Sequence, residues 1–425
     1  MTQTVTRSTP DITMLASNEW ARRPLHERYL SLEEMLPVAG IAKRYGREVA
    51  GKARQLQLQV KEGEVGSLYV GGLFENQPTV PATFTYESFG QLCSRVGAPA
   101  GYLRTLPVVN AAADLQFGLA HREEALEPAK FYAVPQISGG EALLSAPGQV
   151  YAVTGPKYGR IFNFDVIRAV QRMNANSGGI WKVPAASYMA TDPRRATTLY
   201  LGRGSVFLFL VDEDRLIDVN GRKLNRLIIV QNSEIGDRTL RVTTGTHDFV
   251  CDNRMIWGAR NVEQIAVRHT SGAPERFIQE VEPAIRAYAE RSTSLLEFQL
   301  RKAAETPLTI DGKRVASNTE SQVDWLKRQG FSGVLAQVAV VRANAEEGGF
   351  ETVWQAVQGV TAAARDLKPY ADERMDVEEQ AGQMLDRLVP VKPGDERSAY
   401  VSVPALPYAA VTSPLAPDGP RTAIA

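Results

Sequence analysis

The residues best suited to chemistry or recognition lie together in one stretch, from Leu224 to Thr270. Two hydrophobic runs joined by the polar turn Asn232–Asp237 are followed by a dense group of polar and aromatic side chains. This group comprises Cys251, Asp252, Asn253, Arg254, Trp257, Arg268 and His269. Polar and aromatic residues this dense between core-forming runs are typical of a surface held in a fixed shape for recognition. The stretch therefore predicts a site without naming a reaction.

Basic and aromatic side chains in this stretch, and in a loop before it, suit a polyanionic ligand. The segment Thr154–Arg160 (TGPKYGR) places a lysine, a tyrosine and an arginine in one loop. Such a tyrosine ring either stacks on a base or packs under its own loop, and the cations can neutralise phosphates. No carboxylate pair and no His–acid couple stands out, so binding is favoured over proton-transfer catalysis. The candidate nucleic-acid-binding residues are Lys157, Tyr158, Arg160, Arg238, Arg241, Arg254, Trp257, Arg268 and His269.

The common phosphate-binding and catalytic motifs are missing from the sequence. There is no GxxxxGK[ST], no GxGxxG after a strand, no GxSxG and no HExxH. Cys93 and Cys251 have no CxxC companions, which argues against a disulfide framework and a zinc site. We therefore expect no cofactor and no metal. One alternative stays open: Asp212, Glu213 and Asp214 follow an apolar strand, where they either hold Mg²⁺ or are solvated acids.

Composition excludes several classes of protein. The 425 residues carry a formal net charge of zero and are 44% hydrophobic, as expected for two or three globular domains and not for a polycation. Between Val153 and Thr270, however, 17 Lys/Arg face 11 Asp/Glu, which indicates either a basic face or scattered solvated charge. No apolar run is long enough to span a membrane, and the first residues do not resemble a signal peptide. We expect a cytoplasmic, reduced, soluble protein.

Hydrophobic periodicity predicts an α+β fold that begins with a helical part. Residues 1–29 are polar and indicate a flexible arm, and residues 30–148 an N-terminal α/β part. Within this part, Thr83–Pro107 predicts a helical hairpin, either simply packed or DNA-reading. The basic segment Ala39–Lys61 indicates a helix face that is solvated or touches nucleic acid. Residues 149–272 contain short β-rich runs and the turn Asn220-Gly221, which predict a central antiparallel sheet of about five strands.

The period then changes to that of helices. Residues 273–389 predict a C-terminal helical region, and residues 390–425, with seven prolines, a disordered Pro-rich tail. A first helix over Glu275–Ala304 should be kinked or split at Pro283, which cannot donate a backbone hydrogen bond. The later helices are predicted at Glu320–Arg328, Val334–Ala345, Glu351–Ala364 and Asp372–Leu388.

Several segments resemble one family of bacterial, phage and plasmid proteins. They run from NSEIG through VCDNRMIWG to IAVRHTSGAPERF, with ESFGQLCSRVGAPAGYLRTLP, VTGPKYGRIFNFDVIRAV and TTLYLGRGSVFLFLVD upstream in the same order. Together they resemble the family called domain of unknown function 932 over roughly residues 80–280. Related members often carry Trp before the first Asn of the motif, where this chain has Gln231.

The resemblance implies a protein of phages, plasmids and integrated elements, with no catalytic residues to transfer. The order of elements is also similar to that of the single-strand-annealing proteins of phages, an analogy at the level of the fold. Our first hypothesis is a non-enzymatic, homo-oligomeric protein that binds single- or double-stranded DNA in recombination, replication or maintenance of such an element. The alternatives are a metal-dependent enzyme acting on nucleic acid or nucleotides, and a structural or partner-binding protein.

Overall fold

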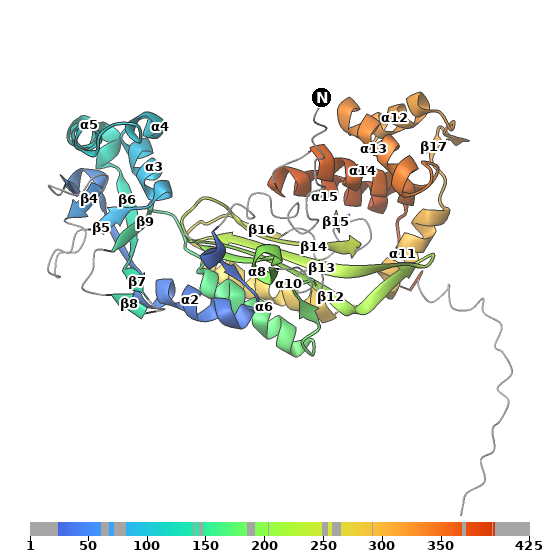
Figure 1. Ribbon diagram of the computed structural model, residues 1–425, viewed down its shortest axis with the longest axis horizontal. Coiled ribbons are helices and arrows are strands. Elements are labelled where there is room, and N and C mark those ends of the chain that lie inside the picture. Colours follow the sequence, from blue (N-terminus) through green and yellow to red (C-terminus); the bar gives the residue numbers. More distant parts are fainter. Residues whose placement is uncertain are drawn as a thin grey trace, which may run out of the picture.

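The computed structural model arranges the chain in three regions (Figure 1). An N-terminal lobe lies at one end, a long antiparallel sheet in the middle, and a C-terminal helical lobe at the other end. This is the mixed α+β fold that the sequence predicts. The structure describes residues 24–60, 68–71, 82–138, 141–143, 148–184, 192–202, 204–248, 254–256, 265–290, 292–367, 371–392 and 394–395.

The central sheet has eight antiparallel strands, and its middle is the long hairpin formed by β12 and β13. The hairpin turns at Asn220-Gly221 with φ values of 54° and 87°, which confirms the turn that the sequence predicts. The order is β1-β11-β12-β13-β14-β15, with β10 paired to β12 and β16 to β14. The strands are β1 (Arg28–Tyr29), β10 (Trp181–Lys182), β11 (Leu199–Gly202), β12 (Ser205–Val219), β13 (Arg222–Ser233), β14 (Leu240–Asp248), β15 (Arg254–Ile256) and β16 (Ile265–Val267).

The first strand of this sheet comes from the segment expected to be a flexible arm. Arg28 pairs with Tyr200 and Tyr29 with Leu199, so the last residues of segment 1–29 belong to the central sheet. Residues 1–23 lie outside the described residues.

Helices α2 (Leu32–Tyr45), α6 (Asn163–Asn176) and α10 (Glu282–Glu290) cover one face of the central sheet (Figure 1). Alternate residues of β12, such as Val206, Leu208 and Leu210, pack into the core between sheet and helices. Helix α2 begins after Ser31, whose Oγ accepts a hydrogen bond from the Glu34 amide at 3.2 Å. Short helical elements complete this region: η1 (Leu25–Glu27), α8 (Pro193–Ala196), α9 (Ala273–Arg276) and the π-helical turn η4 (Phe277–Val281).

The N-terminal lobe contains a six-stranded sheet packed against helices. Its order is β2-β6-β9-β5-β4-β3, antiparallel except for the parallel pair β5–β9. Leu92, Leu115 and Phe131 lie in the core between its sheet and helices. The strands are β2 (Arg47–Lys52), β3 (Gln57–Val60), β4 (Leu68–Gly71), β5 (Ala82–Phe84), β6 (Pro128–Val134) and β9 (Gln149–Thr154), beside the small hairpin of β7 (Gln136–Ser138) and β8 (Glu141–Leu143). The helices are α3 (Tyr86–Arg95), α4 (Ala100–Leu103), α5 (Val108–His121), η2 (Ala53–Gln55) and η3 (Glu123–Leu126).

The basic segment 39–61 is not the helix face that we expected. Helix α2 ends at Tyr45, and the chain continues as the edge strand β2 and then β3. The physical reason is that β2 has a partner from elsewhere in the chain, because Val49 pairs with Phe131 of β6. Pairing of this kind overrides local propensity.

The C-terminal lobe is helical, as predicted, and its later helices lie close to the predicted positions. Ser332 Oγ accepts a hydrogen bond from the Leu335 amide and begins α13. The expected long helix 275–304 is divided. The division lies between the end of α10 at Glu290 and the start of α11 at Ser294, and not at Pro283, which lies in the first turn of α10 just after the π-helical turn. The elements are α11 (Ser294–Glu305), β17 (Thr309–Ile310), β18 (Lys313–Arg314), α12 (Thr319–Arg328), α13 (Gly333–Glu346), α14 (Val353–Leu367) and α15 (Ala371–Leu388).

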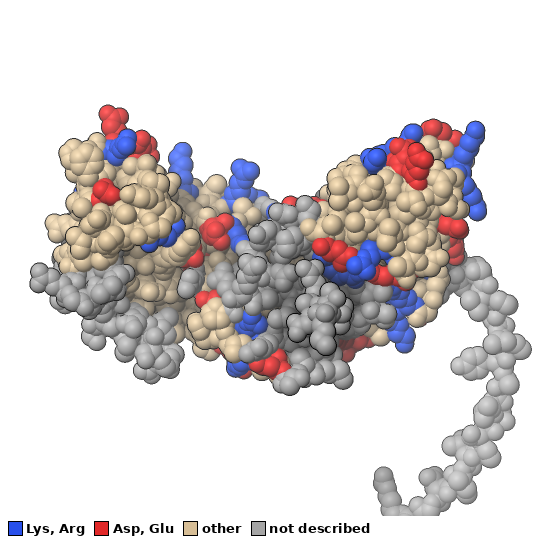
Figure 2. Space-filling model, turned by 45° about the horizontal axis from the view of Figure 1, so that its top comes forward, with Lys and Arg blue, Asp and Glu red and all other residues tan. Residues whose placement is uncertain are grey.

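The two lobes rise on either side of the central sheet, and the molecular surface is hollowed between them (Figure 2). Lys and Arg side chains stand in this hollow on the side of the N-terminal lobe. The fold therefore offers a concave, partly basic surface between the two lobes.

Candidate nucleic-acid interface

Two loops that are distant in sequence pair to form the centre of the candidate site. Tyr158 forms an isolated antiparallel bridge with Thr270, and the Gly159 amide donates to the His269 carbonyl at 3.1 Å. The rings of Tyr158 and His269 stack with centroids 5.1 Å apart. We call residues 157–160 and 268–270 the clasp. Gly159 is required by this pairing, since a Cβ there would lie 2.0 Å from the Thr270 carbonyl oxygen.

The clasp presents two cations to solvent. Lys157 and Arg268 are exposed, and neither forms an ion pair with any residue in the described part of the chain. The antiparallel pairing puts them toward opposite ends of the clasp, while Tyr158 and His269 between them are half-buried. The Tyr158 hydroxyl donates to the Ser233 carbonyl at 3.0 Å, and burial raises its pKa. The tyrosine therefore serves to hold the clasp on β13, with limited ring surface left for stacking on a base.

Arg160, another candidate contact for phosphate, is buried and fully engaged inside the protein. Its guanidinium donates to the Glu234 carbonyl and to Glu48 Oε2, the latter at 2.7 Å, and lies 3.8 Å from the centre of the Tyr132 ring. Lys130 reinforces the junction by donating to the Tyr158 carbonyl at 2.9 Å. Arg160 therefore joins the N-terminal lobe to the central sheet and is not available to a ligand, contrary to our expectation.

Glu234, at the end of β13, is a buried carboxylate that the sequence did not single out. Its Oε1 accepts the Asn163 amide at 2.6 Å, at the positive N-terminus of α6, whereas Oε2 makes no hydrogen bond. Burial raises its pKa to about 7, against the opposing effects of the Asn163 amide and the Arg160 cation. Asn232 joins the same cluster, with Nδ2 donating to Asn163 Oδ1 at 2.8 Å. Ser233 satisfies the turn, because its Oγ accepts the Ile235 and Asp237 amides at 3.4 and 3.3 Å, while Asn232 and Glu234 fix the start of α6.

His269 is held in the neutral form by its surroundings. Burial lowers its pKa, and the nearby Arg160 cation acts in the same direction. Its Nδ1 lies 3.0 Å from the Gly159 carbonyl, so this nitrogen carries the proton and donates. Its Nε2 is buried, faces the Arg238 backbone and makes no hydrogen bond of good geometry. Such a histidine serves the clasp and contributes no positive charge toward a polyanion.

The remaining described candidate residues, which are Arg238, Arg241 and Arg254, lie outside the clasp. Arg238 lies in the turn before β14, half-buried, with its Nε 3.5 Å from Asp237. Arg241 lies farther along β14 and pairs with Asp376 of α15 at 3.5 Å. Arg254 is at the start of β15, paired in register with His247. Trp257 lies outside the described residues.

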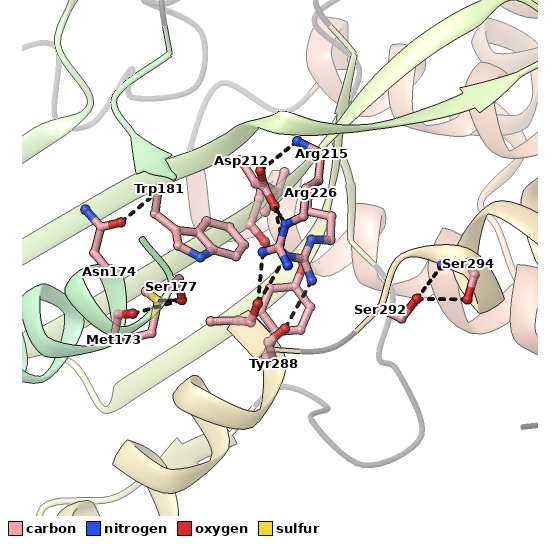
Figure 3. Close-up of polar contacts among 12 residues, drawn as sticks. Met173, Asn174, Ser177, Trp181, Asp212, Arg215, Arg226, Tyr288, Ser292 and Ser294 are labelled. Carbon is pink, nitrogen blue, oxygen red and sulfur yellow. Dashed lines mark hydrogen bonds and ion pairs between the residues drawn. The ribbon is translucent and has the colours of Figure 1, made fainter. Parts of the chain in front are cut away.

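Asp212, the first residue of the acidic run that suggested a metal site, has a structural role (Figure 3). Asp212 is fully buried on β12, and its Oδ2 accepts from Arg226 and from Arg215, each at 2.9 Å. Its Oδ1 accepts the Arg215 amide at 3.0 Å. Both oxygens are therefore occupied by the protein, and Asp214 lies 3.6 Å from Lys182. Among the described residues, no group of three or more His, Cys, Asp or Glu side chains is placed to hold a metal ion.

The helical hairpin of the N-terminal lobe is packed and does not present a reading helix. Arg104, its one long basic candidate, donates to the Tyr86 carbonyl at 2.7 Å and stacks 3.6 Å above the Tyr86 ring. Cys93 is buried in the lobe, and burial raises its pKa to about 11. Within the described ranges, no helix has both the length and the apolar character needed to cross a bilayer.

The fold and site define a mixed α+β protein with an antiparallel central sheet, a paired-loop clasp and no catalytic constellation among the described residues. Comparison with known families adds one identification. Residues 185–389 match the family model described as Domain of unknown function (DUF932), and the chain therefore carries a DUF932 domain over these residues. The resemblance seen in the sequence covered roughly residues 80–280, so the two ranges overlap at residues 185–280. The family model also covers the C-terminal helices up to residue 389, which lay outside the resemblance. No curated protein and no solved structure matches the chain.

Proposed function

We propose that this DUF932 protein binds nucleic acid without chemical turnover, through the cations of its clasp, in the recombination, replication or maintenance of a mobile element. The observation that carries the proposal is the exposed position of Lys157 and Arg268 on loops fixed to each other and to β13. Cations on a rigid support lose little freedom on contacting phosphate, and each contact releases counterions. Such contacts position a polyanion and do not read its sequence.

The shape of the molecule supports the same proposal. The clasp follows β16 directly in the chain, and Figure 1 shows β16 on the central sheet between the two lobes. Figure 2 shows a hollow between these lobes with Lys and Arg side chains in it. A concave surface can follow a nucleic-acid backbone over several nucleotides. The enzyme alternative is less well supported, because Asp212 already has arginine donors on its carboxylate.

A charge-removal experiment tests the proposal. The double variant Lys157→Gln/Arg268→Gln should weaken binding to all sequences alike and flatten the plot of log K against log salt. Because the variant leaves two phosphates without a neutralising cation, the slope should fall by about 1.4 for single strands or about 1.8 for duplex DNA. Fluorescence anisotropy with labelled single- and double-stranded DNA, at several salt concentrations and with or without Mg²⁺, measures both quantities.

The matched control is Lys313→Gln/Arg314→Gln, which removes the same charges from the exposed hairpin β17–β18 in the C-terminal lobe. It should leave the affinity and the salt slope unchanged. Equal effects of the two double variants would show that overall charge, and not the clasp, governs binding. Product formation that depends on Mg²⁺ would favour the nucleic-acid enzyme, and no binding even at low salt would favour a structural or partner-binding protein.

A further inference from the structure

Helix α5 of the N-terminal lobe carries exposed apolar residues opposite its buried face. Its inner face, with residues such as Leu115 and Leu119, is buried in the core of the lobe. Its outer face carries Val109 and Phe117, which are 61% and 65% exposed. The exposed Ala113 lies between them at the same helical spacing. These exposed apolar side chains form a stripe along the outer side of the helix, and such a stripe is suited to a partner.

Two exposed tyrosine rings lie on the other helices of this lobe. Tyr86 begins α3 and is 63% exposed, and Tyr102 of α4 is 59% exposed. Arg104 stacks on Tyr86, and His121 stacks on Phe117 with ring centroids 4.3 Å apart, so both rings are held in place. We call Tyr86, Tyr102, Val109 and Phe117 the aromatic face. On the side of this lobe that Figure 2 shows, few charged side chains are visible. This side is therefore poorly suited to a polyanion and better suited to an uncharged segment.

Such a segment exists in the same chain. Residues 398–417 (SAYVSVPALPYAAVTSPLAP) contain no charged residue. They include two PxxP motifs, Pro404–Pro407 and Pro414–Pro417. Segments of this kind form the extended polyproline helix, which binds to surfaces lined by aromatic rings because little conformational entropy is lost.

We propose that segment 398–417 of one copy docks on the aromatic face of a second copy and links the copies into an oligomer. The segment follows α15 in the C-terminal lobe, which lies at the other end of the molecule from the aromatic face (Figure 1). The 22 residues from 396 to 417 span about 70 Å when extended, enough to reach a neighbouring molecule. This interaction does not depend on nucleic-acid binding.

Sedimentation of the full-length protein over a range of concentrations tests the proposal. The wild-type chain should associate as its concentration rises, and an excess of a synthetic peptide of residues 398–417 should return it to monomer. Phe117→Ser should weaken self-association about tenfold or more, because it removes one anchoring ring. Replacement of all four prolines of the PxxP motifs by alanine should have a similar effect.

The control is Val334→Ser, which removes a side chain that is also 65% exposed, but on α13 of the C-terminal lobe. It should associate like the wild type. The proposal is overturned if the wild type stays monomeric, if the peptide leaves the oligomer intact, or if Phe117→Ser associates as tightly as Val334→Ser. Equal melting temperatures of all variants, taken where the chains are monomeric, show that a loss of association is not a loss of folding.

Discussion

At the scale of the residue, Glu234 has the most unusual environment in the candidate site. It is fully buried, and the Asn163 amide, the helix terminus behind it and the Arg160 cation stabilise its charge only in part. A carboxyl group in this position binds a proton more readily in the folded than in the unfolded protein, because burial penalises the charged form. The stability of the fold is therefore linked to pH through this side chain.

We predict that Glu234→Gln makes the free energy of unfolding less dependent on pH. The pKa of Glu234 is raised from 4.5 to about 7, so its contribution is fully present below pH 4.5 and is lost as pH rises through 7. The loss between these pH values should be at most about 3 kcal/mol, and it should disappear in the variant. Urea denaturation at a series of pH values from 4 to 8 measures it.

His269 acts in the opposite sense, because its lowered pKa removes stability as pH falls below the value of a free histidine. The variant must therefore be compared with the wild type at each pH, and the exposed Glu124→Gln serves as control. A pH profile for Glu234→Gln that runs parallel to the wild type would show that the carboxyl is ionised in the folded protein throughout this range.

Single residues also show where prediction from sequence reaches its limit. Lys157 and Arg160 are neighbouring cations in one loop, yet one is exposed and the other buried. The difference is set by Glu48, which is 112 residues from Arg160 in sequence. The exposed pair Lys157 and Arg268 was within the predicted set, but nothing in the local pattern separates it from the buried members.

At the scale of the element, α10 is attached to the central sheet by charge as well as by packing (Figure 3). Arg226 donates to the carbonyls of Tyr288 and Ala289, at 3.1 and 3.2 Å, and Arg215 also donates to Ala289, at 3.0 Å. These carbonyls lie in the last turn of α10, where helices lack internal donors and carry negative partial charge. Asp212 pairs with both arginines and offsets one of their two positive charges, and the helix carbonyls face the rest.

We predict that Arg226→Met destabilises the protein by roughly 3–5 kcal/mol, because it leaves Asp212 with one partner and the helix carbonyls short of a donor. Adding Asp212→Leu should recover part of this loss, since the buried charge is then gone. Denaturant unfolding of the wild type, the two single variants and the double variant measures these changes in the free energy of unfolding.

Arg276→Gln, which breaks the exposed pair Arg276–Glu280, is the matched control and should cause no measurable change. A loss for Arg226→Met as small as that of the control would mean that α10 is held by its apolar contacts alone.

The elements that sequence predicts well are those fixed by local physics. Helices α12 to α15 begin and end near their predicted residues, because their period is regular and caps such as Ser332 are local signals. The hairpin at Asn220-Gly221 is fixed by its turn. An α/β part was predicted for residues 30–148, but its strands were not located, because strands such as β3 and β5 have only four and three residues, with partners that are set by distant pairing.

At the scale of the whole molecule, the structure indicates how far the chain can be shortened from its C-terminal end without loss of stability. Val389 is buried, and its carbonyl accepts from Gln299 at 3.0 Å. We predict that truncation after Asp395 changes the melting temperature by less than about 2 °C, whereas truncation after Leu388 lowers it clearly. Thermal unfolding at low protein concentration compares the melting temperatures of the two truncated chains. A large loss on truncation after Asp395 would contradict the expectation that the Pro-rich tail is dispensable for the fold; most of that tail lies outside the described residues.

The pairing of β1 with β11 has a consequence for synthesis on the ribosome. Arg28 and Tyr29 are made early, but their partners Tyr200 and Leu199 are made about 170 residues later. At about 5–20 residues per second, this delay is roughly 10–30 s. All strands of the N-terminal lobe are translated within that interval, so the lobe can fold first while the apolar side of α2, including Met35, waits for α6 and the sheet. The nascent chain thus exposes an apolar helix beside a folded lobe. It is therefore most prone to aggregation, and most in need of chaperones, during this interval.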